Sequence, residues 1–332
     1  MPKKTKSSRG KSYDIISIGD ATLDNFLRLE DANVACDVNK QHCMLQLNYA
    51  DKIAVDELHH VIGGNAVNNA VGSSRLGMAS AFYSIVGEDK TGEQIVETVR
   101  MEGVSDEYVA VDKGKSSNYS VVLNYKSERT ILVYHEHRTY KLPKLKRANW
   151  VYLTSMGQGW ERISKNLVAY MKKDGTKMAF NPGTYQLKSG LAVLRPLLAV
   201  TEILFVNKEE AERIVGVHDD LKELLKACCE VGPRITVITD GQNGSFAYDG
   251  NEFWKCGITP TPVIERTGAG DSFATAFVAA THMGKDVPTA LRWGTMNSAS
   301  VILKIGPEAG LLNRAGMAKW LAKYSDIVAK AF

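Results

Sequence analysis

The second half of the chain alternates between short apolar runs and longer stretches in which apolar residues recur every three or four positions. The short runs have the length of buried strands and lie at 150–154, 177–180, 202–206 and 234–239. The longer stretches have helical periodicity and lie near 160–173, 186–195, 207–215 and 219–230. Strands separated by helical spacers predict βαβ units, and therefore a mostly parallel sheet covered by helices.

The rest of the chain adds further elements of both kinds. Strands are expected at 13–18, 79–86 and within 244–256, and helices at 65–76, 90–101, 269–284, 286–304 and about 314–329. Residues 21–62 and 107–137 differ, because they contain short strand-like pieces without helical periodicity, including a hairpin of 117–125 with 130–137. The pattern therefore predicts one large α/β domain, 13–332, with a small β lid made of segments 21–62 and 107–137.

Composition and charge exclude several classes of protein. Hydrophobic residues make up 44% and charged residues 23%, as in ordinary globular proteins, and no apolar run approaches the ~20 residues of a membrane-spanning helix. The formal charge of +4 arises in residues 1–11, which carry five basic and no acidic side chains. We expect residues 1–12 to be a disordered basic tail. The remaining body is nearly neutral, which argues against nucleic acid as a partner.

Five cysteines are too few and too irregularly spaced for a disulfide framework or a metal site. We therefore expect reduced thiols in a cytoplasmic protein. His135 and His137 alternate along an expected strand and would face the same side, but no third metal ligand follows nearby. Arg138 comes next and is expected at the junction of lid and domain. A solvated surface charge is the simpler interpretation of Arg138, and contact with an anionic substrate group is the alternative.

The segment Arg266-Thr-Gly-Ala-Gly-Asp271-Ser-Phe is the strongest candidate for chemistry. Gly268, Ala269 and Gly270 leave backbone amides open to a ligand and lead directly into a helix, whose N-terminus attracts anions. Asp271 then lies in the first helical turn beside this anion hole. A carboxylate at that position serves either as a helix cap or as a base for a phosphoryl acceptor, because phosphoryl transfer depends mostly on positioning and charge stabilisation.

This segment resembles the C-terminal signature of the ribokinase (PfkB-type carbohydrate and nucleoside kinase) family. Gly63-Gly64-Asn65-Ala-Val-Asn68-Asn-Ala70 resembles the family's N-terminal signature, and the order and spacing of both agree over about residues 13–312. The resemblance implies a doubly wound, mostly parallel sheet flanked by helices, with a small β-sheet lid. It also implies an ATP-dependent kinase that phosphorylates a hydroxymethyl-type hydroxyl of a small carbohydrate.

Individual roles follow from the resemblance. Asp271 resembles the catalytic base, with Gly268–Gly270 as the anion hole. The residues that resemble the substrate-binding set are Asp20, Asp24, Gly63, Gly64 and Asn68. Those that resemble the nucleotide-binding set are Asn207, Glu210, Thr239, Gly241, Gly244 and Asn297, and Glu210 is also expected to hold Mg²⁺ through water. Several have simpler structural interpretations, such as Asn207 as a helix cap and Gly241 with Gly244 as a hairpin turn.

Two departures from the family pattern bear on cofactor and substrate. Glu265-Arg266 replaces the common Asp-Thr near a monovalent-cation site, which argues against potassium activation. Residues 27–60 are longer than the same lid segment in small sugar kinases.

Two other functions remain open. A nucleoside (adenosine-type) kinase would use lid aromatics to stack on a base, with Phe26, Tyr49, Tyr119 and Tyr134 as the candidates. A catalytically silent sugar- or nucleotide-sensing protein is the alternative of another class. In each case the lid is also expected to form a homodimer, because an isolated β sheet of this size needs a cover for its second face.

Overall fold

The computed structural model describes residues 12–37, 43–125, 128–173 and 175–332, so all but one residue of the expected basic tail lies outside the described residues. Within them, ten strands form one large sheet in the order β16-β15-β14-β13-β12-β11-β10-β1-β6-β7. Pairing is parallel from β13 to β7, whereas β14, β15 and β16 add an antiparallel edge. The strands are β1 (Tyr13–Ile18), β6 (Ser80–Gly87), β7 (Ser105–Asp112), β10 (Ala148–Leu153), β11 (Lys177–Phe180), β12 (Ile203–Asn207), β13 (Ile235–Thr239), β14 (Ser245–Tyr248), β15 (Phe253–Cys256) and β16 (Lys330–Ala331).

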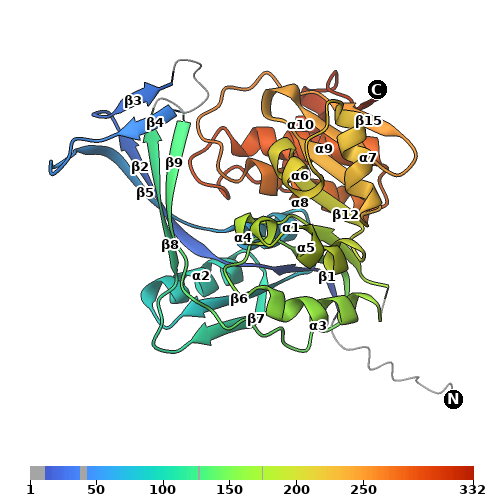
Figure 1. The fold of residues 1–332 in the computed structure, drawn as a ribbon, viewed down its shortest axis with the longest axis horizontal. Helices are drawn as coiled ribbons and strands as arrows, with labels where there is room; N and C mark the ends of the chain where they lie inside the picture. Colours follow the sequence, from blue (N-terminus) through green and yellow to red (C-terminus); the bar gives the residue numbers. More distant parts are fainter. Residues whose placement is uncertain (1–11, 38–42, 126–127, 174) are drawn as a thin grey trace.

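Helices cover both faces of this sheet (Figure 1). One face packs against α3 (Glu161–Met171), α5 (Leu191–Leu198), α6 (Lys208–Val215) and α7 (Leu221–Glu230). The other packs against α1 (Asn65–Arg75), α2 (Lys90–Met101), α8 (Ala269–His282), α9 (Val287–Val301) and α10 (Arg314–Lys323). On β1, Ile16 packs on the face covered by α3 and α5–α7, and Ile15 packs on the opposite face, because successive strand residues face opposite sides of a sheet. The predicted α/β fold class is confirmed.

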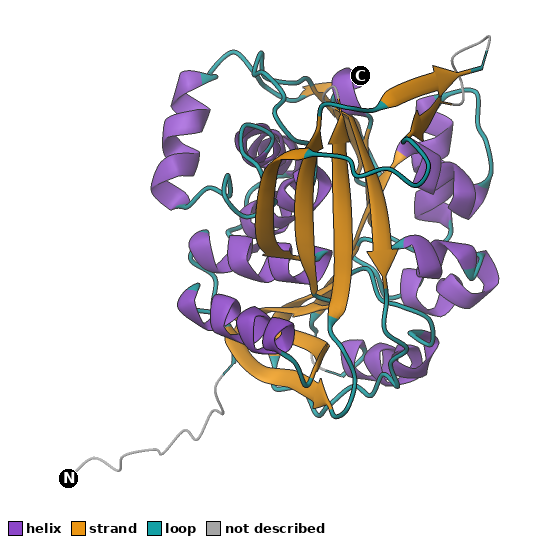
Figure 2. Cartoon of the chain, turned by 90° about the vertical axis from the view of Figure 1, so that its left-hand side faces the viewer, coloured by secondary structure: helices purple, strands orange, loops and turns teal. Residues whose placement is uncertain are grey.

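A second sheet forms the lid, with strand order β5-β2-β8-β9 (Figure 2). Its strands are β2 (Thr22–Leu29), β5 (Val55–Gly63), β8 (Asn118–Tyr125) and β9 (Glu128–Tyr134). A separate hairpin of β3 (Asn33–Cys36) and β4 (Cys43–Gln46) extends from it. The expected second lid segment, 107–137, divides between the sheets, because β7 pairs in parallel with β6 in the large sheet and only the residues from Asn118 onward enter the lid.

Helix boundaries differ from expectation in two places. The helix expected at 186–195 is two helices, α4 (Thr184–Lys188) and α5, separated by Gly190. The helix expected to reach 329 ends at Lys323, and the following chain returns to the sheet edge as β16. No helix in the described part of the chain is both long and apolar enough to span a bilayer.

The expectation that all cysteines are reduced thiols is wrong for one pair. Cys36 and Cys43 are disulfide-bonded across the β3–β4 hairpin, where antiparallel pairing places them opposite each other. Cys228, Cys229 and Cys256 are free thiols. A sequence separation of seven does not by itself indicate a disulfide, because the hairpin register is what brings the two sulfurs together.

Candidate active site

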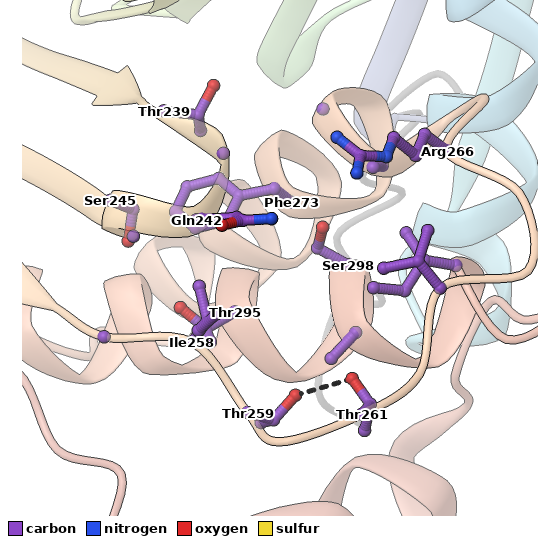
Figure 3. Close-up of a pocket in the computed structure, with 18 residues that line it drawn as sticks. Thr239, Gln242, Ser245, Ile258, Thr259, Thr261, Arg266, Phe273, Thr295 and Ser298 are labelled. Carbon is purple, nitrogen blue, oxygen red and sulfur yellow. Dashed lines mark hydrogen bonds between the residues drawn. The ribbon is translucent and has the colours of Figure 1, made fainter. Parts of the chain in front are cut away.

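Two adjoining cavities lie where the candidate residues meet. The lid cavity, of about 400 Å³, lies between the lid and the ends of the central strands, and its lining includes Asp20, Asp24, Asn68, Glu210 and Asp271. The loop cavity, of about 240 Å³, is lined by the β13–β14 turn, the start of α8 and one side of α9 (Figure 3). The two cavities share four lining residues, which are Thr239, Arg266, Gly270 and Phe273.

Asp271 lies in the first turn of α8, at the floor of the lid cavity, and is 7% exposed. Its Oδ2 accepts a hydrogen bond of 2.8 Å from Nδ2 of Asn68. Burial raises the pKa of Asp271 to about 6, and the nearby carboxylates of Glu210 and Asp24 add to the increase, while the Asn68 hydrogen bond opposes it. This carboxyl group is therefore ionised at neutral pH but more basic than an exposed aspartate.

Gly268 makes the start of α8 possible. It has φ +80°, in the left-handed region, and a Cβ at this position would lie 2.4 Å from Cβ of Pro307. The amide of Ala269 donates to the Arg266 carbonyl at 3.2 Å, so this amide closes the turn and is not an open donor. The amides of Gly270 and Asp271 lie in the first turn, where an α-helix provides no acceptor. A Cβ on Gly270 would meet no atom within 4 Å, so a ligand can approach these amides closely.

Asp20 follows β1 and is held by the body of the protein. Its Oδ2 accepts hydrogen bonds from the Tyr140 hydroxyl at 2.7 Å and from the Gly157 amide at 2.8 Å. Burial raises the pKa of Asp20 to about 6. Its Oδ1 is buried and has no hydrogen-bond partner among the described residues. The sequence analysis missed Tyr140 and Gly157, because neither belongs to a local pattern that includes Asp20.

Asp24 and Asn68 approach the same cavity from the lid and from α1. Asp24, on β2, accepts a hydrogen bond from the Ser120 hydroxyl of β8, and burial raises its pKa. Asn68 uses its amide nitrogen for Asp271, whereas its buried Oδ1 has no partner in the described structure. Asp20, Asp24 and Asn68 all line the cavity, and Asp20 and Asn68 each keep one oxygen without a hydrogen-bond partner among the described residues. Oxygen acceptors of this kind can bind hydroxyl groups.

The two glycines at the junction of β5 and α1 have different surroundings. Gly63 is the buried last residue of β5 and pairs with Thr22 of β2. Gly64 lines the lid cavity, with φ +103°. A Cβ on Gly64 would lie 2.6 Å from the Asp20 carbonyl, so only glycine allows α1 to begin beside Asp20.

Asn207 and Glu210 form a capping box at the start of α6. The Glu210 amide donates to Oδ1 of Asn207 at 2.8 Å, and the Asn207 amide donates to Oε2 of Glu210 at 2.9 Å. Both residues also line the lid cavity, so the cap and the site are compatible. Burial raises the pKa of Glu210. No cluster of three or more His, Cys, Asp or Glu able to hold a metal occurs among the described residues.

The nucleotide-side predictions divide into two groups. Thr239, Gly241 and Gly244 line the loop cavity, around the turn that joins β13 to β14 (Figure 3). Asn297 does not line it. Its Nδ2 donates to the Ser272 carbonyl at 2.7 Å and its Oδ1 accepts from the Leu312 amide at 2.9 Å, so it joins α8, α9 and the following loop inside the core. On α9, Thr295 and Ser298 face the cavity instead.

Arg138 is neither a solvated charge nor a residue of the cavity lining. Its side chain is completely buried, with Nη1 3.2 Å from Oδ2 of Asp112 and Nη2 donating to the Ser116 carbonyl. The solvated-charge interpretation is wrong, because the end of β7 supplies a partner that lies 26 residues earlier in the chain. The alternative, contact with an anionic substrate group, stays a prediction. His135 does line the lid cavity, with Nδ1 4.0 Å from Oδ2 of Asp20.

Comparison with known proteins gives a consistent result. Residues 31–314 match the model of the pfkB family carbohydrate kinases. A 5-dehydro-2-deoxygluconokinase of Shouchella clausii is 27% identical over 316 residues, which cover 89% of this chain and 91% of the relative. Arabidopsis thaliana ribokinase complexed with ribose and ATP superposes with a TM-score of 0.76 at 21% identity, over 94% of this chain and 99% of that one. A Methanocaldococcus jannaschii nucleoside kinase superposes with a TM-score of 0.75 at 18% identity, over 95% and 99%. With the family model matching residues 31–314, and with residues of both signatures at two adjoining cavities beneath the lid, the chain belongs to the pfkB family of carbohydrate kinases.

Proposed function

We propose that this protein transfers the γ-phosphoryl group of ATP to a hydroxymethyl-type hydroxyl of a small carbohydrate, with Asp271 as the base. The observation that carries the proposal is the position of Asp271. Its buried carboxylate lies in the first turn of α8, in contact with Asn68 and in the same cavity as Asp20 and Asp24.

The chemistry follows from these positions. The free oxygens of Asp20 and Asn68, together with Asp24, hold the acceptor hydroxyls. This binding orients one hydroxyl toward Asp271. Asp271 takes the proton of that hydroxyl as its oxygen attacks the phosphorus. A pKa of about 6 suits this role, because the carboxylate is ionised at neutral pH and is still a competent base. The amides of Gly270 and Asp271, with the helix dipole, stabilise negative charge on the transferred group.

A magnesium ion fits the charges of this site. The carboxylates of Glu210 and Asp24 raise the pKa of Asp271, so a divalent cation placed near the three groups would relieve this repulsion. Glu210 would hold Mg²⁺ through water, beside Asn207, and the bound ion would neutralise the triphosphate. Because Mg²⁺ retains several waters, a dense carboxylate cluster is not required.

The acceptor is proposed to be a carbohydrate for two reasons. The relative from Shouchella clausii is named for a deoxygluconate, and the solved Arabidopsis thaliana protein binds ribose. A nucleoside acceptor was expected to stack on lid aromatics, yet none of the four candidates lines the lid cavity: Phe26, Tyr49, Tyr119 and Tyr134. A cytoplasmic location accompanies the proposal, since ATP is the phosphoryl donor.

A coupled ADP-release assay tests this function. The acceptors are ribose, fructose, sugar acids, phosphorylated sugars, adenosine, guanosine and cytidine, each with and without a chelator of Mg²⁺. We expect chelator-sensitive turnover with at least one carbohydrate, which Asp271→Asn lowers by about 10²–10⁴-fold. Turnover with nucleosides alone would favour the nucleoside kinase. Folded protein that binds ATP but releases no ADP with any acceptor would indicate the silent sensor.

A further inference from the structure

Arg266 occupies the junction of the two cavities. It is a shared lining residue of the lid cavity and the loop cavity, immediately before the start of α8. In Figure 3 its guanidinium projects from the loop toward the space beside Gln242 and Phe273. A group transferred from a nucleotide in the loop cavity to an acceptor in the lid cavity has to pass this position.

The backbone of Arg266 is fixed while its side chain is available. Oε1 of the buried Glu265 accepts from the Arg266 amide at 2.7 Å, and from the amide and hydroxyl of Thr267, each at 3.0 Å. The Arg266 carbonyl accepts from Ala269, as described above. These bonds fix the loop that projects the guanidinium, and the guanidinium itself donates no hydrogen bond to another described residue.

One acidic partner lies near the guanidinium. Oε1 of Glu128, on the lid strand β9, is 3.9 Å from Nη2 of Arg266, and the two side chains are 75% and 42% exposed. An exposed pair at this distance is weak, so it does not compete strongly with a phosphate. A guanidinium with free donors binds phosphate oxygens through paired hydrogen bonds.

We propose that Arg266 is a catalytic residue that binds the γ-phosphoryl group of ATP before and during transfer; this rests on the proposed function. In that step the acceptor oxygen forms a bond to the γ-phosphorus, and the bond from that phosphorus to the β–γ bridging oxygen breaks. The bridging oxygen leaves with the electron pair as ADP, and the acceptor proton passes to Asp271. Arg266 neutralises charge on the oxygens of the moving group, while the amides at the start of α8 approach from the other cavity wall.

A different role for Arg266 would be to attach the lid to the loop through Glu128. The two roles predict different results for Glu128→Gln, which breaks the pair and leaves the arginine in place. If Arg266 binds the phosphoryl group, Glu128→Gln turns over like the parent. If the ion pair is what matters, Glu128→Gln and Arg266→Gln lose activity equally.

The experiment compares four variants in the ADP-release assay with the best acceptor. Arg266→Gln should lower kcat by about 10²-fold, the usual cost of removing one transition-state donor. Arg266→Lys should retain part of the activity, because it keeps the charge but loses the paired donors. Glu128→Gln and the control Arg162→Gln, an exposed arginine on α3, should remain within about twofold of the parent. A kcat for Arg266→Gln within about threefold of the parent, or an equal loss in Glu128→Gln, overturns the proposal.

Nucleotide binding without acceptor separates this proposal from the proposed function. Titration calorimetry with ATP and with ADP should show that Arg266→Gln weakens ATP binding about tenfold more than ADP binding, since ADP lacks the γ-phosphate. Equal weakening, or none, overturns the role of Arg266. A parent protein with no turnover on any acceptor overturns the proposed function instead, and the ratio of ATP to ADP affinity still tests Arg266.

Discussion

Asp271→Asn should change stability and catalysis in opposite directions. Burial, with some contribution from Glu210 and Asp24, raises the pKa of Asp271 from 3.8 to about 6. By linkage, the ionised carboxylate then costs the folded state about 3 kcal/mol at pH 7. A negative charge in the first turn of α8 offsets roughly 0.3–1 kcal/mol of this cost through the helix dipole. An asparagine oxygen can still accept from Asn68, so the variant is expected to be more stable by about 2 kcal/mol.

The sign of this effect depends on pH. Since the folded pKa of Asp271 is raised, the carboxylate destabilises the parent by the full amount above about pH 6. This cost becomes smaller as pH falls from 6 and disappears near 3.8, the pKa of the unfolded state. The stability gain of the variant should therefore be full at pH 7.5 and small near pH 4. At roughly 2 °C per kcal/mol for a chain of this size, the melting temperature should rise by about 4 °C at pH 7.5.

The catalytic effect of the same variant is a loss. An amide cannot accept the hydroxyl proton, so kcat should fall by about 10²–10⁴-fold, while ATP affinity changes little. Melting temperature, ATP binding and ADP release are measured on one preparation at both pH values. A variant less stable than the parent at pH 7.5 would refute the burial argument, and a well-folded variant that turns over like the parent would refute the base.

Four further outcomes are expected. The kcat/KM of the parent should decline as pH falls through about 6, because Asp271 must be ionised, and a profile flat to pH 4.5 would contradict this. Asn68→Ala should lower turnover, because it removes the hydrogen bond to Asp271. The neighbouring variant Asn69→Ala loses buried hydrogen bonds to Ser17 and Thr275, so it should cost about 1–3 kcal/mol of stability and leave kcat unchanged. Arg138→Ala should destabilise by about 1–3 kcal/mol in thermal or urea unfolding without raising the acceptor KM, because it removes the buried guanidinium that donates to the Ser116 carbonyl and pairs with Asp112. If the exposed outer face of the lid forms a homodimer, Leu132→Asp should convert a dimer to a monomer in sedimentation, and a monomeric parent at micromolar concentration would contradict the dimer.

Local pattern in the sequence determined the kinds of element and the starts of α6 and α8. A strand exposes alternate residues and a helix repeats every 3.6, so the βαβ alternation from residue 150 onward is visible without any knowledge of packing. The Gly268–Gly270 run and Asp271 are also local, because a helix start and its first-turn carboxylate are neighbours in the chain. The same holds for Asn207 and Glu210, whose capping box spans three residues.

The tertiary structure decided which of these residues meet. Asn68 and Asp271 are separated by 203 positions and touch only because α1 packs against α8. The same kind of contact buries Arg138 against Asp112 and turns Asn297 into the core, away from the loop cavity. It also assigns β7 to the large sheet, because β7 pairs with β6. These contacts depend on how helices and strands that are far apart in the sequence pack together. A short window of sequence does not contain that information.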